Sequence, residues 1–330
     1  MKIGIVGGTG NISTSIVRLL VRQGHQVVCF NRGRQGKSPA RVQTVICDRA
    51  DRAAFEAAVK AQHLDAAIDM ICFNREEALS SIRAFEGVAH VVHCSTVCTY
   101  GVAYDWMPVS EDHPLRPAID YGRNKVATDA AYLEAYYRNG FPVTIIKPST
   151  TYGPQMGALR QVAREFSWID RIRKGLPIVV CGDGLAVHQF LHVDDAALGF
   201  AGVLGKTHCI GQTYNLVRSG FVSWADYHRT AMDVLGRQVE MVGVPLADLL
   251  AASVPGVEIC RDIFAHNLYY DNARLCRDVP EFQPAVSLAQ GLAGVIEAMD
   301  RQGGIPDCES VTWEDTLIGA QRRVGGAMAE

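Results

Sequence analysis

The chain has 330 residues, of which 48% are apolar and 20% are charged, with a formal net charge of −3 and a pI near 6.4. This length predicts about two domains, and the composition is typical of a globular enzyme with a full core. The weak negative charge gives no reason to expect nucleic acid or membrane binding, and no apolar run reaches the length of a membrane span.

The ten cysteines show no disulfide or metal pattern. Four lie at or near the ends of apolar strands, where cysteine acts as a small hydrophobe: Cys29, Cys47, Cys72 and Cys94. There is no Cys-x-x-Cys, and Cys98 follows Cys94 without clustered histidines, so we expect no metal. Because residues 1–6 lead directly into a strand, we expect no signal peptide. The prediction is a reduced, cytoplasmic chain.

The first thirty positions predict a strand, a glycine-rich turn, a helix and a second strand. The strands cover residues 2–6 and 26–30, and the helix ends near Gly24. This order is the context that a dinucleotide site requires. Gly7 permits the tight turn, and Gly10 lets a pyrophosphate approach the backbone at the helix N-terminus. Ser13 stands where a third glycine is usual and is small enough to keep most of the close packing.

The second strand ends in Phe30-Asn31-Arg32-Gly33-Arg34. An acidic residue here would accept from the ribose hydroxyls and favour NAD. Asn31 lacks that charge, whereas Arg32 and Arg34 could pair with a 2′-phosphate. We therefore predict NADP as the preferred cofactor and NAD as the alternative. A solvated basic loop without a ligand is the plain alternative.

Strands and helices then alternate along the chain. Strands are expected at 42–47, 64–71, 90–94 and 143–147, and helices at 51–60, 75–85 and 121–137. This alternation predicts an α/β fold with a Rossmann-type doubly wound parallel sheet. After about Pro154 the pattern loosens, and we expect short strands at 178–180, 190–193 and 214–217 and helices at 157–174, 224–235, 245–252 and 287–301.

These elements predict two domains. The Rossmann domain covers residues 1–154 and includes segments that return to it, at about 185–217 and 256–270. A smaller, irregular α/β substrate domain takes 155–184, 218–255 and 271–330.

Tyr121 and Lys125 lie one turn apart on a predicted helix and therefore share a face. A free tyrosine has a pKa near ~10 and is a poor base at neutral pH, but a nearby cation favours the phenolate. Lowering the pKa to about 7 takes roughly 4 kcal/mol, so Lys125 is expected to act with help, such as a cationic cofactor ring. We predict a general acid/base. The alternative is an exposed helix pair with no role.

Residues 93–101 follow a predicted strand at the sheet edge where ligands bind. With this segment the chain resembles an extended short-chain dehydrogenase/reductase of the NAD-dependent epimerase/dehydratase type. The resemblance covers residues 1–217 well and 218–330 loosely. Its motifs are Gly7-Gly8-Thr9-Gly10, Asp48, Ser95-Thr96 with Tyr100-Gly101, Ser110-Glu111-Asp112, Tyr121 with Lys125, Tyr152-Gly153-Pro154, His192-Val193-Asp194-Asp195 and Phe282-Gln283-Pro284.

The resemblance implies a role for each matching residue. Thr96 holds the substrate oxygen, with Ser95 as the fallback; Tyr121 transfers the proton; Lys125 binds the nicotinamide ribose and lowers the tyrosine pKa. Asp48 meets the adenine amino group. The expected cofactor contacts are Gly7, Thr9, Gly10, Asn11, Ile12, Asn31, Arg32, Arg34, Asp48, Met70, Tyr121, Lys125, Lys147 and Pro148. The expected substrate contacts are Ser95, Thr96, Thr150, His188 and Arg261.

Departures from the family pattern bear on the substrate. Val97-Cys98 stand where dehydratases carry Asp-Glu, so elimination of water from a nucleotide sugar is not expected. Thr150-Thr151 replace an asparagine that helps to hold a sugar nucleotide, and His188-Gln189 replace an Arg-Asp pair, with Arg261 as a second phosphate arginine. Asp69-Met70-Ile71-Cys72 replaces His-x-Ala-Ala, as in a divergent branch that includes chloroplast RNA-binding proteins.

We predict an NAD(P)-dependent oxidoreductase or epimerase that moves a hydride to or from a secondary alcohol carbon of a sugar or sugar nucleotide. A nucleotide-sugar 4-epimerase with a transient keto intermediate is one alternative. An alternative of another class is a nucleotide-sensing or RNA-binding protein, which the net charge and the lack of a basic stripe oppose. Because relatives often pair Rossmann helices, we also expect a homodimer, with the paired face supplied by the helix that carries Ala127, Ala131 and Leu133 and by the 75–85 helix. The alternative is that these apolar residues pack on the chain's own sheet.

Overall fold

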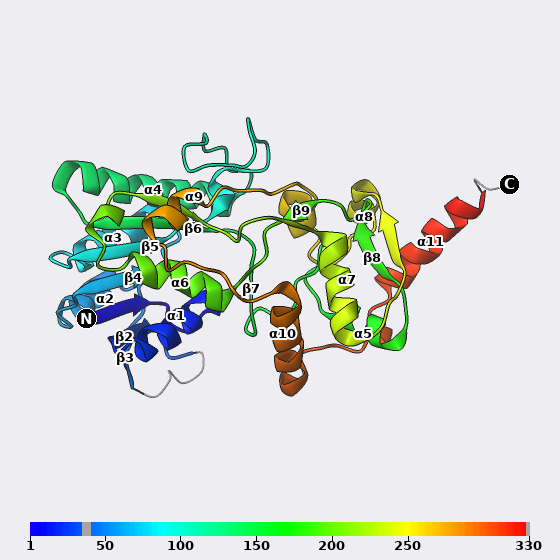
Figure 1. Cartoon of the computed structure of the whole chain (residues 1–330), viewed down its shortest axis with the longest axis horizontal. Coiled ribbons are helices and arrows are strands. Elements are labelled where there is room, and N and C mark those ends of the chain that lie inside the picture. The colour runs from blue at the N-terminus through cyan, green and yellow to red at the C-terminus, as the bar shows by residue number, and fades with distance from the viewer. Residues whose placement is uncertain (35–40, 328–330) are drawn as a thin grey trace. The chain divides into compact units, whose positions relative to one another are not determined.

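The computed structural model describes residues 1–34 and 41–327, with side chains as far as Arg323. The chain divides into two compact units, and neither of them is continuous in sequence (Figure 1). The first unit consists of Met1–Thr151, Leu191–Ser219 and Tyr270–Ala285. The second unit consists of Tyr152–Phe190, Gly220–Tyr269 and Val286–Glu330.

A parallel sheet forms the centre of the first unit. Among the described residues it has seven strands in the order β11-β6-β5-β4-β1-β2-β3. Their bounds are β1 (Lys2–Val6), β2 (Gln26–Asn31), β3 (Val42–Ile46), β4 (Ala66–Asp69), β5 (His90–Cys94), β6 (Val143–Pro148) and β11 (Thr213–Leu216). Strands are added on both sides of β1, which is the doubly wound order. The predicted Rossmann-type sheet is confirmed.

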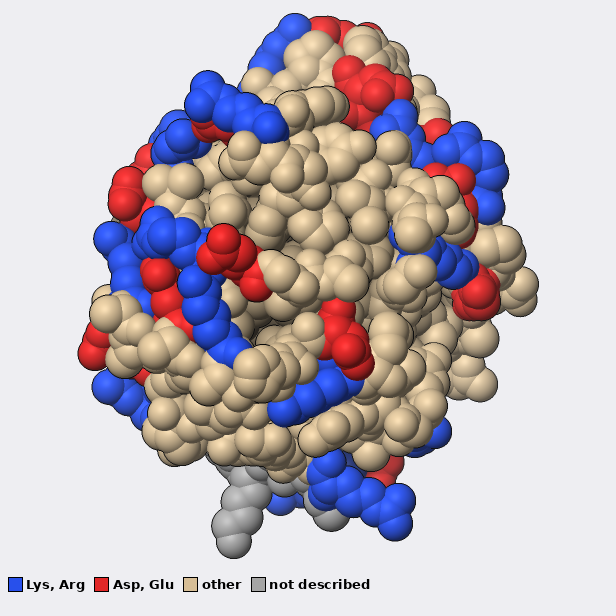
Figure 2. Space-filling view, turned by 90° about the vertical axis from the view of Figure 1, so that its left-hand side faces the viewer, with Lys and Arg blue, Asp and Glu red and all other residues tan. Residues whose placement is uncertain are grey.

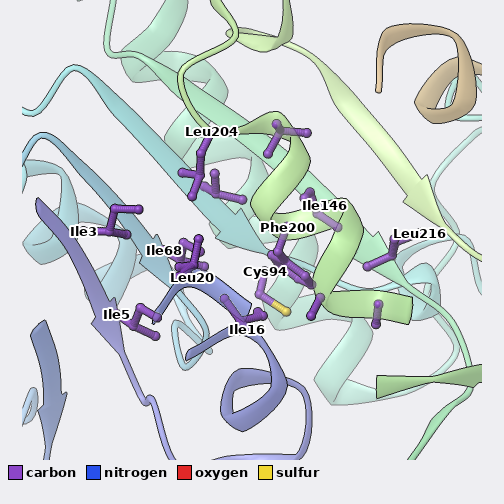
Figure 3. Close-up of a cluster of buried hydrophobic side chains, with 14 of the residues drawn as sticks. Ile3, Ile5, Ile16, Leu20, Ile68, Cys94, Ile146, Phe200, Leu204 and Leu216 are labelled. Atoms are coloured by element: carbon purple, nitrogen blue, oxygen red, sulfur yellow. The ribbon is translucent and has the colours of Figure 1, made fainter. Parts of the chain in front are cut away.

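Helices cover both faces of this sheet. They are α1 (Asn11–Arg22), α2 (Arg52–Lys60), α3 (Arg75–Ala84), α4 (Asp120–Asn139), α6 (Val193–Val203) and α9 (Ala273–Asp278). Figure 1 shows α1 and α6 on one side of the sheet and α3 and α4 on the other. In Figure 3, Leu20 of α1 lies next to Ile68 of β4, and Phe200 of α6 lies next to Cys94 of β5. Burying each such side chain contributes about 1.5–3 kcal/mol, so this apolar face holds α1 against the sheet.

The second unit contains short strands and five helices among its described residues. Strand β8 (Ile178–Cys181) pairs in parallel with β13 (Met241–Val244), and β9 (Val187–His188) pairs antiparallel with β12 (Val222–Ser223). The helices are α5 (Ser167–Lys174), α7 (Trp224–Leu235), α8 (Leu246–Ala251), α10 (Leu288–Gln302) and α11 (Trp313–Ala327). The short strands β7 (Thr151–Tyr152) and β10 (Leu191–His192) lie at or next to passages between the units.

The helix expected over residues 157–174 forms only from Ser167 onward, as α5. Gly157 has a φ of +81°, which is outside the helical region. Gln161 is buried; its side chain accepts from the Cys181 amide at 3.0 Å and donates to the Phe264 carbonyl at 3.3 Å. Buried Arg160 pairs with Glu314. Because these polar partners lie far away in sequence, they hold residues 157–166 in an irregular path despite the apolar periodicity.

The boundaries of the two units differ from the expected ones. Residues 256–269 belong to the second unit, whereas Tyr270–Ala285 belong to the first. The Asn215 side chain of β11 explains part of this, because it donates to the carbonyls of Val109 at 3.0 Å and Asp271 at 3.1 Å. The Tyr270 hydroxyl also bonds to the Tyr104 hydroxyl at 2.9 Å. These contacts attach the segment that begins at Tyr270 to the sheet domain.

Two findings bear on the surroundings of the chain. No helix in the described ranges has both the length and the apolar character to cross a membrane. All ten cysteines lie within the described ranges and are free thiols.

Candidate active site

The loop after β5 fixes Thr96 at the carboxyl edge of the sheet. Residues Val97–Thr99 form one turn of 3-10 helix, η1, and Thr96 caps it by accepting from the Cys98 amide at 3.2 Å. The Thr99 hydroxyl donates to the Thr96 carbonyl at 2.9 Å. Thr96 is therefore held through both its side chain and its backbone, and it is only 6% exposed.

Tyr121 lies in the first turn of α4, with its hydroxyl beside the Thr96 side chain. Although 42% of Tyr121 is exposed, the protein around its hydroxyl desolvates the phenol. This burial raises the pKa of Tyr121 above its ordinary value, while the neighbouring Thr96 side chain acts in the opposite direction. The phenol is therefore protonated at neutral pH and is ready to donate a proton.

The approach of α4 to η1 depends on Gly122. A β-carbon at position 122 would lie 2.5 Å from the Cys98 carbonyl oxygen and 2.9 Å from the Pro117 β-carbon. Neither distance is tolerated, so any larger residue has to separate Tyr121 from the Thr96 loop.

Gly122→Ala is expected to lower stability by about 1–3 kcal/mol, because overpacking forces the backbone apart. In an open helix the same change normally adds about 1 kcal/mol. Gly294 on α10 provides the matched control, since a β-carbon at position 294 would have nothing within 4 Å among the described residues. In urea unfolding, Gly294→Ala should therefore leave the free energy of unfolding unchanged or raise it, whereas Gly122→Ala should lower it. Equal changes in the free energy of unfolding for the two variants would contradict the close approach of α4 to η1.

Lys125 is buried one helical turn beyond Tyr121, with 1% of its surface exposed. Its Nζ donates to the carbonyls of Cys72 at 2.7 Å and Cys94 at 2.6 Å, which leaves one of its three protons for another acceptor. It lies 6.0 Å from the centre of the Tyr121 ring. Burial of the phenol by the protein itself raises the pKa of Tyr121, and the lowering expected from Lys125 together with a cationic cofactor ring stays a prediction.

A pocket of about 640 Å³ opens at the same edge of the sheet, within the first unit. Its volume falls in the range typical of small-molecule sites. Predicted cofactor residues that line it are Gly7, Thr9, Gly10, Asn31, Arg32, Arg34 and Asp48. Phe73 also lines it, and the Phe73 ring centre lies 6.4 Å from that of Tyr121. Phe73 therefore connects the pocket with the Thr96–Tyr121 pair.

The residues around the α1 N-terminus fit a dinucleotide. Gly7 has a φ of +84°, which lets the chain turn tightly before the helix. Both side-chain polar atoms of Asn11 and the Nδ2 of Asn31 are buried without a hydrogen-bond partner among the described residues. Such orphaned groups next to a helix N-terminus suit the phosphates and hydroxyls of a nucleotide. Ile12 instead packs against the core on the α1 face.

Two side chains in this region have structural roles that the sequence did not indicate. The Asn31 Oδ1 accepts from the Gly8 amide at 2.9 Å and so braces the glycine turn. The Ser13 Oγ accepts from the Gly10 amide at 2.7 Å, so Ser13 caps α1 as well as preserving its close packing.

Arg32 and Arg34 are exposed at the mouth of the pocket, and neither forms an ion pair with any residue in the described ranges. Asp48 is exposed beside them, and its Oδ1 accepts from the Ala50 amide at 3.0 Å. Two guanidinium groups and a carboxylate oxygen therefore remain available to an adenosine or its phosphate.

Several lining residues were not predicted: Arg49, Phe55, Ile71, Phe73 and Glu77. Arg49 follows β3, and Ile71 and Phe73 follow β4, so the rule that ligands bind beyond the carboxyl ends of parallel strands would have found these three. Phe55 and Glu77 lie on α2 and α3, and no local signal identifies them.

Other predicted residues do not face this pocket. Met70 packs against the core on the α1 face. Lys147 is buried, with its Nζ 3.1 Å from Asp129, and the Ser95 hydroxyl donates to the same carboxylate at 2.8 Å. Pro148 is buried at the end of β6, and the Thr150 carbonyl accepts from the Leu191 amide at 3.0 Å. Ser95 is thus engaged by a carboxylate, and Thr96 keeps the substrate role in our prediction.

His188 and Arg261 belong to the second unit. His188 is buried among aromatic rings, with centroids 5.2 Å away at Trp224 and 5.4 Å away at Phe264. This burial lowers the pKa of His188 to about 3, so the ring is neutral. Arg261 pairs with its neighbour Asp262, Nε to Oδ1, at 2.6 Å. Their substrate roles stay predictions.

One group in the described part of the chain has the spacing of metal ligands: Asp170, Asp307 and Cys308, also in the second unit. The Lys174 ammonium lies 2.9 Å from Asp170 and 2.6 Å from Asp307. A side-chain cation therefore already neutralises these carboxylates.

Charges on the visible face of the molecule are mixed in sign. Figure 2 shows lysine and arginine side chains next to aspartate and glutamate around a broad uncharged area. A nucleic-acid backbone would require a continuous basic surface, and this face does not present one.

Comparison with known proteins connects the chain to sugar-modifying enzymes. The profile of the NAD dependent epimerase/dehydratase family matches residues 3–78 and 75–216. The 2'-dehydrokanamycin reductase of Streptomyces kanamyceticus is 27% identical over 310 residues, which is 94% of this chain and 87% of the relative. The dTDP-glucose 4,6-dehydratase of Streptomyces griseus is 29% identical over 277 residues, 83% of this chain and 78% of the relative.

Solved structures show the same fold. The UDP-glucuronic acid 4-epimerase from Bacillus cereus, solved with UDP-glucuronic acid and NAD, superposes with a TM-score of 0.73 at 18% identity. The match covers 92% of this chain and 100% of that one.

Proposed function

From the premise that this chain belongs to the NAD-dependent epimerase/dehydratase family, we propose that it transfers a hydride to or from a secondary alcohol carbon of a sugar or sugar nucleotide. It is an NAD-dependent enzyme of the extended short-chain dehydrogenase/reductase kind. The observation that carries the proposal is the placement of Tyr121 beside Thr96, with buried Lys125 one helical turn away.

Each of the three side chains has a distinct task in this proposal. The nicotinamide of the bound cofactor supplies or accepts the hydride. Tyr121 donates its proton to the substrate oxygen as a carbonyl becomes an alcohol, or accepts a proton in the reverse direction. The Thr96 hydroxyl holds the same oxygen. The remaining Lys125 proton binds a ribose hydroxyl, and its charge stabilises a developing phenolate.

Net reduction of a ketone is the direction that we propose. The relative named 2'-dehydrokanamycin reductase, similar to 94% of this chain, supports the same direction.

The test combines cofactor titration with turnover. Purified protein is titrated with NADPH and NADH, followed by nicotinamide fluorescence, and then given UDP-glucose, dTDP-glucose and their 4-keto forms. Net consumption of reduced cofactor with a keto sugar supports the proposal. Conversion of one sugar isomer into another without net consumption identifies the epimerase alternative instead. Absence of a fluorescence change with either cofactor would reject the redox function.

Cofactor preference is the finer part of the proposal. The family uses NAD, and we propose that this chain prefers NADP because Arg32 and Arg34 lie at the mouth of the pocket. A 2′-phosphate carries roughly two negative charges near neutral pH, and an arginine fork can bind it bidentately.

Arg32→Ala should weaken NADP(H) binding by roughly ten- to a hundredfold and leave NAD(H) almost unchanged, since one charge-assisted bond contributes about 1.5–3 kcal/mol. Asn31→Asp should shift preference toward NAD(H), because the new carboxylate repels the phosphate yet still accepts from the Gly8 amide. Dissociation constants at two salt concentrations measure both effects. Arg22→Ala, which removes an exposed charge at the end of α1, is the control. Equal losses for both cofactors would reject the NADP preference.

We also propose that the enzyme works in the cytoplasm as a homodimer. Ten free thiols suit a reducing compartment. Ala131, part of the expected paired face, is buried against the chain's own sheet, so the contact would use exposed positions of α4 such as Tyr137, which is 78% exposed. Sedimentation of the purified protein tests the dimer.

A further inference from the structure

We infer that Asp129 and Lys147 are positioning residues that lock the Thr96 loop to the helix carrying Tyr121. The catalytic part of this inference rests on the proposed function. The attachment of the Thr96 loop to α4 can be tested without cofactor or substrate. Both side chains are buried, Asp129 at 3% and Lys147 at 4% exposure.

The Asp129 carboxylate contacts side chains from two strands, β5 and β6. Its Oδ2 lies 3.1 Å from the Lys147 Nζ of β6 and accepts from the Ser95 hydroxyl at 2.8 Å. Its Oδ1 lies 3.3 Å from the His93 Nε2 of β5. One carboxylate on α4 therefore holds the ends of β5 and β6 together.

The proton on His93 can be placed from its neighbours. The Thr128 hydroxyl donates to the Lys125 carbonyl at 2.8 Å, so its oxygen must accept from the His93 Nε2, 3.1 Å away. The Nε2 therefore carries the hydrogen and donates it to the Thr128 hydroxyl, while the Asp129 Oδ1 lies 3.3 Å from the same nitrogen. Burial lowers the pKa of His93, so the ring is neutral and Lys147 is the cation that balances Asp129.

Lys147 extends the network to the backbone of the catalytic threonine. Its Nζ donates to the Thr99 hydroxyl at 2.8 Å and lies 4.8 Å from the Tyr100 ring centre. The Thr99 hydroxyl in turn donates to the Thr96 carbonyl at 2.9 Å. A continuous chain of bonds thus runs from Asp129 through Lys147 and Thr99 to Thr96, and a second runs through Ser95, the residue before it.

Asp129 lies on the same helix, α4, as Tyr121 and Lys125. Tyr121, Lys125 and Asp129 are spaced by four residues and share one face of the helix. Lys125 bonds the Cys94 carbonyl, Asp129 bonds the Ser95 hydroxyl, and Tyr121 lies beside Thr96. The helix is therefore attached to residues 94 and 95 at two successive turns, which fixes the position of the Tyr121 hydroxyl relative to that of Thr96.

Hydrogen exchange measured by mass spectrometry tests the lock without cofactor or substrate. In an Asp129→Leu/Lys147→Met double variant, which leaves no buried unpaired charge, amides of residues 95–101 should exchange about tenfold faster or more, while residues 7–13 stay unchanged. Lys147→Arg keeps the charge and should keep the protection. Glu134→Gln, on the same helix but in an exposed ion pair with Arg75, is the control.

Turnover and cofactor affinity form the second readout. With whichever keto sugar reacts in the screen above, the double variant should lose at least about tenfold in kcat and keep its dissociation constant for NADPH. Should the double variant not fold, Ser95→Ala and Thr99→Val each remove one hydroxyl of the network and should raise exchange at residues 95–101 alone. Unchanged exchange there in folded variants, or an equal rise across the whole first unit, would overturn the inference whether or not the enzyme is active.

Discussion

Tyr121→Phe is expected to reduce turnover by ~10²–10⁴-fold, the usual contribution of general acid/base catalysis. The change removes the hydroxyl that lies beside Thr96 and keeps the ring that faces Phe73. The wall of the pocket is therefore preserved, and the dissociation constants for NADPH and NADH should barely change.

Steady-state rates and fluorescence titrations on the same preparations measure both quantities. Tyr137→Phe is the matched control, because Tyr137 lies on the same helix and is 78% exposed. If Tyr121→Phe kept most of the activity, another group would have to be the proton donor. A parallel loss of cofactor affinity would instead assign Tyr121 to binding.

Asp69→Asn is expected to lower the free energy of unfolding by about 3–5 kcal/mol, the range for removing one partner of a buried ion pair. Asp69 is fully buried at the end of β4 and accepts from the Arg49 Nη1 at 2.9 Å and the Ser81 hydroxyl at 2.6 Å. Asparagine has nearly the same shape but leaves the buried Arg49 with only Glu77, whose Oε2 lies 3.8 Å from the Arg49 Nε, as a counter-charge. Urea unfolding of the full chain measures the loss.

The same pair predicts a dependence on pH. Burial alone would raise the pKa of Asp69, but Arg49 and the Ser81 hydrogen bond outweigh it and hold the pKa below its ordinary value. A depressed pKa in the folded state adds stability above the unfolded pKa of about 3.9, and this stability is lost as the pH falls through and below that value. Wild type should therefore lose more stability than Asp69→Asn between neutral pH and pH ~3.

An Arg49→Met/Asp69→Leu double variant separates the charge effect from packing. It removes both charges, so most of the lost stability should return. If the double variant lost as much free energy of unfolding as Asp69→Asn, the pair would stabilise the fold through packing and not through charge balance.

Local signals in the sequence predicted most of the sheet domain. The apolar stretch before Gly7 and the spacing of Ile16, Leu19 and Leu20 are sufficient for β1 and α1, because strand and helix periodicities act over a few residues. Tyr121 and Lys125 were placed on one helix face by the same rule. The burial of Lys125 was not predictable, since it depends on the carbonyls of Cys72, which follows β4, and of Cys94, which ends β5.

The features that the sequence did not predict have a common physical origin in contacts between residues far apart in the chain. Lys147 of β6 pairs with Asp129 of α4, and the cofactor role expected for Lys147 stays a prediction. The irregular path of residues 157–166 depends on partners of Gln161 at Cys181 and Phe264. Phe73 carries no motif, and its place in the pocket follows from the direction in which β4 ends.

The interleaving of the two units has a consequence for synthesis on the ribosome. The sheet of the first unit needs β11, which ends at Leu216, and the segment Tyr270–Ala285 completes that unit. Domains usually fold as units, with the N-terminal one first while translation continues. Here β11 emerges only after the first segment of the second unit, Tyr152–Phe190, has been translated. The edge of β6 therefore stays unpaired on the nascent chain until β11 emerges, and it is the edge that a chaperone would have to protect from intermolecular pairing.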